Sequence, residues 1–309
     1  MPNVRGNKYS KNHVTYDSCP TCKEYWSFGL EEPATIDYPA SIDYILNVTQ
    51  QKDLYFIGYS MGTSHYFMLL SEKPQYNEKI KAGIMIGPAI YLDNPIFKHF
   101  RHILTTILNV IEWLGQYEAA SSALAELSHR ACTNQFFSPL CHRMWNKLLN
   151  ANDDLKTSLV KMSNTPAGSA ILQLEFQAVF KKLLLFILLF STGSSIKTYK
   201  HYMQHMSGKF SKYDYGTKAN LKLYGTTDPP KYNLENVRVP TKLYVAQSDE
   251  FSSVLKNADL VSDLPNSLGY HIVDRKDWKH MDFAFSSELN ERVYNHVLSD
   301  LSQFEEEGF

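Results

Sequence analysis

The sequence has no excess of charge of either sign. Its 31 lysine and arginine residues nearly balance 32 aspartate and glutamate residues. A protein that holds a phosphate backbone or an anionic membrane by charge needs a strong positive field, and this balance supplies none. We therefore expect no nucleic-acid partner.

The sequence also lacks a long hydrophobic run. Its strongest apolar stretch is Leu183–Phe190, whereas a helix needs about 20 apolar residues to cross a bilayer. The first residues, Met1–His13, are polar and basic and contain no apolar core of a signal peptide. We expect no transmembrane segment and no secretory signal within this chain.

Cysteine is scarce, with four residues in two local pairs: Cys19 and Cys22, then Cys132 and Cys141. An even number in local pairs favours an oxidising compartment. Neither pair is accompanied by a second pair of matching spacing, so no zinc site is predicted. Cys19 and Cys22 have C-x-x-C spacing but follow no predicted strand, which favours a local disulfide or two free thiols over redox catalysis. We expect no metal and no cofactor.

Apolar segments alternate with amphipathic ones in two parts of the chain. The helix-like segments are Pro39–Val48, Thr63–Leu70 and Leu289–Leu301, and the strand-like segments are Leu54–Ile57, Ala82–Ile86, Thr241–Ala246 and Tyr270–Val273. Continuous apolar strands between helices are typical of a parallel sheet that is covered on both faces. The fold class is therefore α/β with a mostly parallel sheet.

Between these two parts, from Ile96 to about Tyr202, the pattern is helical without clear strands, as in Phe97–Leu114 and Ser121–Leu127. The length of 309 residues suits one large α/β domain with an insertion. We predict that residues 1–95 form the first part of the core, 96–235 a mainly helical cap, and 236–309 the second part of the core.

Gly58-Tyr59-Ser60-Met61-Gly62 matches G-x-S-x-G between a predicted strand and a predicted helix. A serine hydroxyl is a poor nucleophile, and a strained strand-to-helix turn exposes it to a histidine that can take its proton. The flanking glycines allow the tight turn and the close approach of the helix. Ser60 is the predicted nucleophile, and the backbone N–H of Met61 is an expected oxyanion-hole donor.

A serine nucleophile of this type is followed in the chain by an acid and then by a histidine, each after a later strand. Asp249 follows the strand Thr241–Ala246, and its rivals are Glu250, Asp259 and Asp263. His280 follows the strand Tyr270–Val273 and is the best placed of the 11 histidines. His65 lies on the helix after the motif and is interpreted as a helix-face residue, because the base must approach from a separate loop.

Several separate stretches resemble the acid lipase family of gastric and lysosomal lipases. Asn3–Ser10 resembles its N-x-R-G-N-x-Y-S segment, Tyr38–Ile45 its D-L-P-A-x-I-D-Y-I helix, and Gly58–Gly62 its G-H-S-x-G elbow. Further matches follow in order at Gly208–Phe210, Tyr213–Gly216, Pro229–Leu234 and Lys279–Phe283. The resemblance covers most of the chain.

This resemblance implies an α/β-hydrolase fold with an inserted helical cap, and hydrolysis of triglycerides or cholesteryl esters at a lipid–water interface. It assigns Ser60, Asp249 and His280 to the catalytic triad, and Cys132 with Cys141 to the disulfide of the cap. It also implies a secreted or lysosomal protein, in which the sequon Asn47-Val48-Thr49 can carry a glycan.

The sequence departs from the family pattern in two ways. Family members carry upstream strands and an H-G-L loop that supplies a second oxyanion donor, and this chain begins after both. The segment around Leu183–Phe190 looks like additional material, so residues 171–190 are either a genuine cap element or an insertion artefact. These departures leave one alternative to a neutral-lipid esterase, a catalytically impaired or incomplete homologue that lacks a complete oxyanion hole. A third hypothesis keeps the fold but changes the substrate to a small soluble ester or thioester.

Overall fold

The computed structural model describes residues 3–7, 9–92, 95–119 and 194–308. Of residues 95–100, only the backbone is described. Four strands lie in it: β1 (Leu54–Tyr59), β2 (Ile80–Ile86), β3 (Thr241–Val245) and β4 (Ser267–Ile272). They form one sheet in the order β1-β2-β3-β4, and all three pairs are parallel. The predicted parallel sheet is confirmed.

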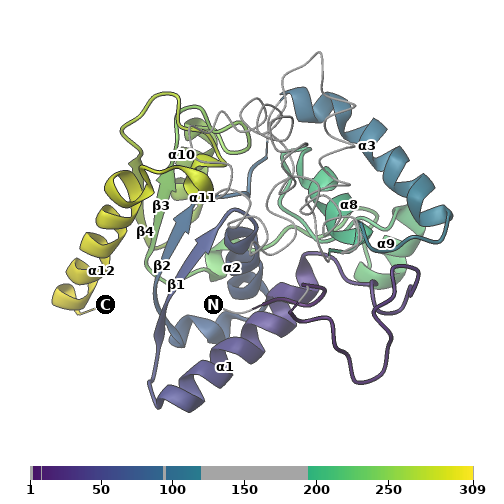
Figure 1. The fold of residues 1–309 in the computed structure, drawn as a ribbon, viewed down its shortest axis with the longest axis horizontal. Helices are drawn as coiled ribbons and strands as arrows, with labels where there is room; N and C mark the ends of the chain where they lie inside the picture. Colours follow the sequence, from purple (N-terminus) through teal and green to yellow (C-terminus); the bar gives the residue numbers. More distant parts are fainter. Residues whose placement is uncertain (1–2, 8, 93–94, 120–193, 309) are drawn as a thin grey trace, which may run out of the picture.

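Helices cover both faces of this sheet (Figure 1). The α-helices are α1 (Tyr38–Thr49), α2 (Met61–Glu72), α3 (Pro95–Trp113), α8 (Ile196–His205), α9 (Thr217–Tyr224), α10 (Val254–Asp263), α11 (Asp282–Phe285) and α12 (Asn295–Glu307). Shorter helical turns are η1 (Pro33–Asp37), η2 (Pro74–Glu78), η3 (Leu234–Asn236) and η4 (Asn290–Tyr294).

Local sequence signals explain several of these boundaries. The side chains of Ser195 and Ser253 accept hydrogen bonds from the backbone N–H three residues later, which caps the first turns of α8 and α10. Gly225 ends α9 in the left-handed region at φ 75°. Strand β2 is buried along nearly its whole length because helices pack on both of its faces.

The core has one layer on each face of the sheet. On one face, Phe67 and Leu70 of α2 pack with Ile42 of α1 and with Met85 and Leu243 of the sheet. On the other face, strand residues pack against the carboxyl-terminal helices, and this layer includes Ile84, Tyr244, Phe283, Val297 and Phe304. Helix α2, which begins next to Ser60, is thereby held rigidly on the sheet.

The described helices between residues 96 and 235 form a group of their own beside the sheet (Figure 1). Leu104 and Leu108 of α3 pack against Ile196, Tyr199 and Met203 of α8. Phe210, Tyr232 and Leu234 lie within the predicted cap range but belong instead to the core cluster of α2. The cap boundaries stay a prediction, and Ser121–Leu127, Leu183–Phe190, Cys132 and Cys141 lie outside the described residues.

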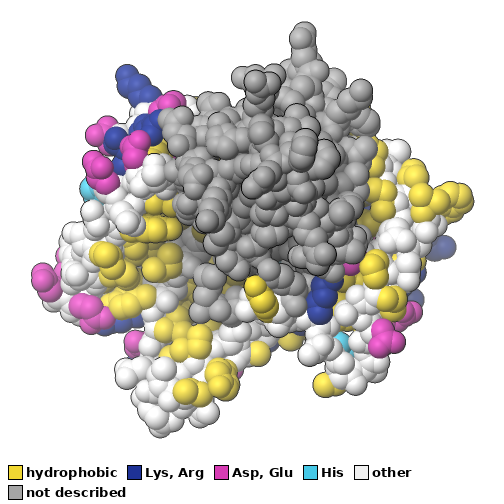
Figure 2. Space-filling view, in the orientation of Figure 1, with side chains coloured by type: hydrophobic (Ala, Val, Ile, Leu, Met, Phe, Trp, Pro, Cys, Tyr) yellow, Lys and Arg dark blue, Asp and Glu magenta, His cyan; other side chains and the backbone are white. Residues whose placement is uncertain are grey.

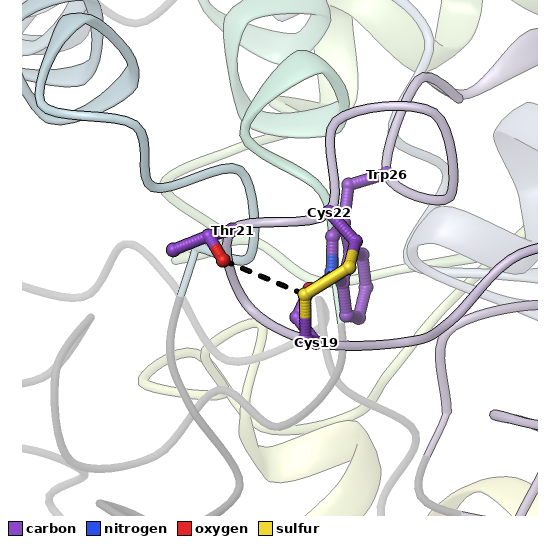
Figure 3. Close-up of a disulfide and its surroundings, with 4 residues drawn as sticks. All are labelled: Cys19, Thr21, Cys22 and Trp26. Atoms are coloured by element: carbon purple, nitrogen blue, oxygen red, sulfur yellow. Dashed lines mark hydrogen bonds between the residues drawn. A yellow bond between two sulfur atoms is a disulfide. The ribbon is translucent and has the colours of Figure 1, made fainter.

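Cys19 and Cys22 form a disulfide, which is one of the two states expected for them (Figure 3). Trp26 packs beside this turn, and its Nε1 donates to the carbonyl of Cys19 at 2.8 Å. The carbonyl of Pro20 accepts from the backbone N–H of Tyr117 at 2.9 Å and of Glu118 at 3.2 Å. The disulfide turn therefore supports the chain just beyond α3.

Three histidines outside the predicted triad, His65, His201 and His205, are buried. Burial lowers the pKa of His65 to about 3 and that of His205 to about 4, and burial followed by the charge of His205 holds the pKa of His201 well below its usual range. Neither ring nitrogen of His65 has a hydrogen-bond partner among the described residues. As predicted, His65 is a helix residue, and the imidazole in contact with Ser60 is that of His280.

These histidines predict that the protein loses stability in acid. Above the ordinary imidazole pKa of about 6.5 they are neutral in both states. As pH falls from there towards 3, the unfolded chain takes up protons that the folded chain refuses, so the free energy of unfolding decreases. Chemical denaturation at pH 8 and pH 5 measures this loss, and His65→Leu should reduce it. An equal effect of His65→Leu on stability at both pH values would contradict the explanation.

Candidate active site

Ser60 lies in the turn between β1 and α2 with a strained backbone. Its φ of 49° and ψ of −112° put a non-glycine residue at positive φ, a conformation that costs free energy and persists only when its surroundings hold it. The backbone N–H of Ser60 donates to the carbonyl of Ile86 at 3.0 Å. The end of β2 therefore fixes the turn that presents the serine hydroxyl.

Polar side chains in the first turn of α2 also hold the turn that contains Ser60. The hydroxyl of Thr63 donates to the carbonyl of Ser60 at 2.5 Å and accepts from the backbone N–H of Ala89 at 3.0 Å. The hydroxyl of Ser64 donates to the carbonyl of Ala89 at 2.9 Å. The turn is thus tied to the segment after β2.

The two glycines of the motif have different roles. A Cβ at Gly58 would lie 3.1 Å from the backbone of Gly62 and Thr63, so this glycine permits the close approach of α2. A Cβ at Gly62 would meet its nearest described atom, the hydroxyl oxygen of Tyr38, only at 3.9 Å. The predicted steric need for glycine is therefore confirmed at Gly58, whereas no described contact demands it at Gly62.

Asp249 is held in a tight turn after β3. Its Oδ1 accepts from the backbone N–H of Phe251 at 2.8 Å and of Ser252 at 3.1 Å. These two bonds direct Oδ2 towards His280. Of its sequence rivals, Asp259 pairs with Lys256 and Asp263 accepts from the hydroxyl of Tyr91. The third rival, Glu250, is the next residue in the chain, and its charge acts on His280.

His280 lies between the other two predicted residues. Its Nε2 is 2.7 Å from Oγ of Ser60, and its Nδ1 is 2.8 Å from Oδ2 of Asp249. All three residues are buried, with exposed fractions of 7% for Ser60, 6% for Asp249 and 2% for His280. The structure therefore brings together the three residues that the sequence predicted.

Aromatic rings flank the imidazole of His280. The ring of Tyr59 stacks on it at 5.4 Å between centroids with an interplanar angle of 26°, and the ring of Phe251 lies 4.7 Å away at 55°. A Cβ at Gly87 would be 3.2 Å from the imidazole, so glycine is needed beneath it. The sequence reasoning did not identify these neighbours, although Tyr59 is the variable residue of G-x-S-x-G just before the serine.

The carboxylates set the protonation of His280. Burial lowers the pKa of His280, but the charge of Asp249 and its hydrogen bond more than offset this, so the net pKa is raised. Burial raises the pKa of Glu250 to about 7, and the charge of Asp249 acts in the same direction. Ionised Glu250 in turn favours the protonated form of His280.

This arrangement is suited to nucleophilic chemistry. With a proton on Nδ1 shared with Asp249, Nε2 of His280 can accept the hydroxyl proton of Ser60 as the oxygen attacks a carbonyl. Met61 follows as the first residue of α2, where the helix N-terminus favours negative charge. Among the described residues, no group of three or more histidine, cysteine, aspartate or glutamate side chains could hold a metal ion.

Comparisons with known proteins agree with this fold. The model of the alpha/beta hydrolase fold family matches residues 1–284. Lipase 3 of Drosophila melanogaster is 32% identical over 99% of this chain and 73% of its own length, and Lipase 1 of the same fly is 28% identical over 99% of this chain and 64% of its own length. Human lysosomal acid lipase/cholesteryl ester hydrolase is 28% identical over 99% of this chain and 71% of its own length.

A role for His280 as the base predicts a particular pH dependence. The base must be neutral, and its raised pKa keeps it protonated to a higher pH than the ordinary 6.5. We expect kcat/KM on a soluble ester to rise with pH through a midpoint above 6.5. Glu250→Gln should move this midpoint to lower pH, because it removes a neighbouring negative charge. A profile that is already flat at pH 5 would rule out this protonation scheme.

Proposed function

Since the chain belongs to the alpha/beta hydrolase fold family and, within it, to the acid lipases, we propose that it hydrolyses carboxylic esters of neutral lipids through Ser60, His280 and Asp249. The observation that carries this proposal is the continuous hydrogen-bonded series from Ser60 through His280 to Asp249. The chain spans 64% of the length of Lipase 1. Its own activity and substrates are accordingly part of the proposal.

The reaction would proceed in two halves. Oγ of Ser60 attacks the ester carbonyl while Nε2 of His280 takes its proton, and Asp249 stabilises the imidazolium that forms. The backbone N–H of Met61 would donate to the oxyanion. Collapse of the tetrahedral intermediate releases the alcohol, which receives the proton from His280. Water, activated by the same histidine, then hydrolyses the acyl-enzyme and regenerates Ser60.

A neutral lipid ester is the proposed substrate, either a triglyceride or a cholesteryl ester. The human relative is named as a cholesteryl ester hydrolase. Large apolar side chains are exposed on α3 and just after it, among them Val110, Trp113 and the following Leu114. Hydrophobic side chains are visible over α3 at the right edge of Figure 2. Such a surface supports action at a lipid–water interface.

A secreted or lysosomal location is proposed from the same relatives. Asn47 of the sequon is exposed on the last turn of α1, where a glycan could be attached. The Cys19–Cys22 disulfide also suits an oxidising compartment. In the parts of the chain that the structure describes, no helix is long and apolar enough to span a membrane.

Covalent labelling tests the nucleophile directly. We expect a fluorescent organophosphonate to label the wild-type protein and to leave Ser60→Ala unlabelled. Ser71→Ala, on the far end of the same helix, is the matched control and should be labelled normally. Asp249→Asn should lower kcat on the order of 10⁴-fold, because it favours the wrong imidazole tautomer. Undiminished labelling of Ser60→Ala would refute the assignment.

Substrate comparison tests the lipid class. Hydrolysis of long-chain triglyceride and cholesteryl oleate emulsions should exceed that of short-chain soluble esters, with a rise in rate once substrate forms an interface. A preference for soluble esters would favour the small-ester alternative. A folded protein without activity on any ester would favour the catalytically impaired homologue.

A further inference from the structure

Tyr59 contacts the main chain of His280 as well as its ring. The hydroxyl of Tyr59 donates to the backbone carbonyl of His280 at 3.0 Å. The ring of Tyr59 covers one face of the imidazole at the same time. A single side chain therefore restrains both the loop that carries His280 and the orientation of its ring.

The position of Tyr59 in the chain gives these contacts their importance. Tyr59 is the last residue of β1 and directly precedes Ser60, so it is fixed by its parallel pairing with Ile86. His280 lies on the loop between β4 and α11, outside the sheet. The contact therefore ties the loop that carries His280 to the strand that leads into Ser60.

The hydroxyl of Tyr59 is a dependable donor. Burial raises its pKa well above the usual value, and the charge of Asp249 raises it further. The phenol therefore stays protonated throughout the pH range in which ester hydrolysis is measured. The acid lipase motif that this elbow resembles has histidine at the position of Tyr59.

We propose that Tyr59 is a positioning residue for the proposed reaction: it fixes the backbone carbonyl and one ring face of His280 so that Nε2 stays within reach of Ser60. The proposal rests on the proposed catalytic role of Ser60, His280 and Asp249. Tyr59 itself does not contact the reacting atoms through its hydroxyl. Its effect is exerted on the distance and alignment of the 2.7 Å contact between His280 and Ser60.

Tyr59→Phe isolates the hydroxyl while it retains the ring. Loss of the donor frees the buried carbonyl of His280, and the loop can then shift away from Ser60 and Asp249. Because small misplacements of catalytic groups are costly, we expect kcat to fall on the order of 10-fold, with KM unchanged within about twofold. The second-order rate constant for labelling by the organophosphonate should fall by a similar factor.

The pH profile separates positioning from a structural role. Weaker contact with Asp249 should lower the pKa of His280, so the acid limb of kcat/KM should move to lower pH in Tyr59→Phe. A loss of folded protein would instead scale the whole profile without moving it. Rates are normalised to phosphonate-titrated sites, so that unfolded molecules do not count even if the variant folds poorly.

Tyr244→Phe provides the matched control. Tyr244 is also a buried strand tyrosine, but its hydroxyl bonds to Asp300 at 2.6 Å. This variant should keep the wild-type kcat and pH profile. Equal kinetics of Tyr59→Phe and wild type, or a lowered kcat with an unmoved acid limb, would overturn the positioning role.

Ser60→Ala in the same assays distinguishes failure of the proposed function from failure of the positioning role alone. If Ser60→Ala remains active, the proposed function itself is wrong. If Ser60→Ala is inactive and Tyr59→Phe behaves as wild type, only the positioning role is lost.

Discussion

Parallel pairing of the four strands is the constraint on which the candidate site depends. Because β1, β3 and β4 all point the same way, the residues that follow them emerge at one edge of the sheet. Ser60 and His280 are 220 positions apart, and Asp249 and His280 are 31 apart, yet both pairs are in hydrogen-bond contact. A change in strand order would separate all three, whatever their identity.

The close packing of α2 on the sheet fixes the position of Ser60 relative to the strands. A Cβ at Gly83 of β2 would lie 2.5 Å from the hydroxyl oxygen of Tyr66, so glycine lets α2 approach the sheet closely. The hydroxyl of Tyr66 then lies 2.7 Å from Oγ1 of Thr241 at the start of β3. One helix is thus fixed to two strands, and its first turn holds Ser60 in a strained conformation that an isolated segment would abandon.

The sequence predicts the site better than its surroundings. Ser60 is identified from the motif and its flanking elements, while Asp249 and His280 follow from chain order. Strand limits are predicted less accurately. The strand β4 begins three residues before the predicted start at Tyr270, and the prediction missed these residues because Ser267 and Gly269 are not typical of strands. The final predicted helix, Leu289–Leu301, is instead a π-helical turn followed by α12, which continues to Glu307.

Other features could not be predicted because they depend on tertiary register. The bond from Tyr59 to His280 joins residues 221 positions apart. No local pattern distinguishes such a tyrosine from one that merely fills the core. Likewise, no local pattern separates Asp249 from Glu250, Asp259 and Asp263, whereas in the structure it is Oδ2 of Asp249 that lies 2.8 Å from Nδ1 of His280.

Burial and charge act in opposite directions on the pKa values of the buried histidines. His65 and His280 are equally enclosed, yet burial without a carboxylate takes the pKa of His65 to about 3, whereas Asp249 raises that of His280. The main difference is the carboxylate of Asp249, whose Oδ2 faces His280 while Oδ1 accepts from two backbone N–H groups, and the charge of Glu250 acts in the same direction. The acid loop therefore sets how basic His280 is. Strand β1, through Tyr59, sets where it lies, so the two properties of the proposed base are controlled from different parts of the sheet.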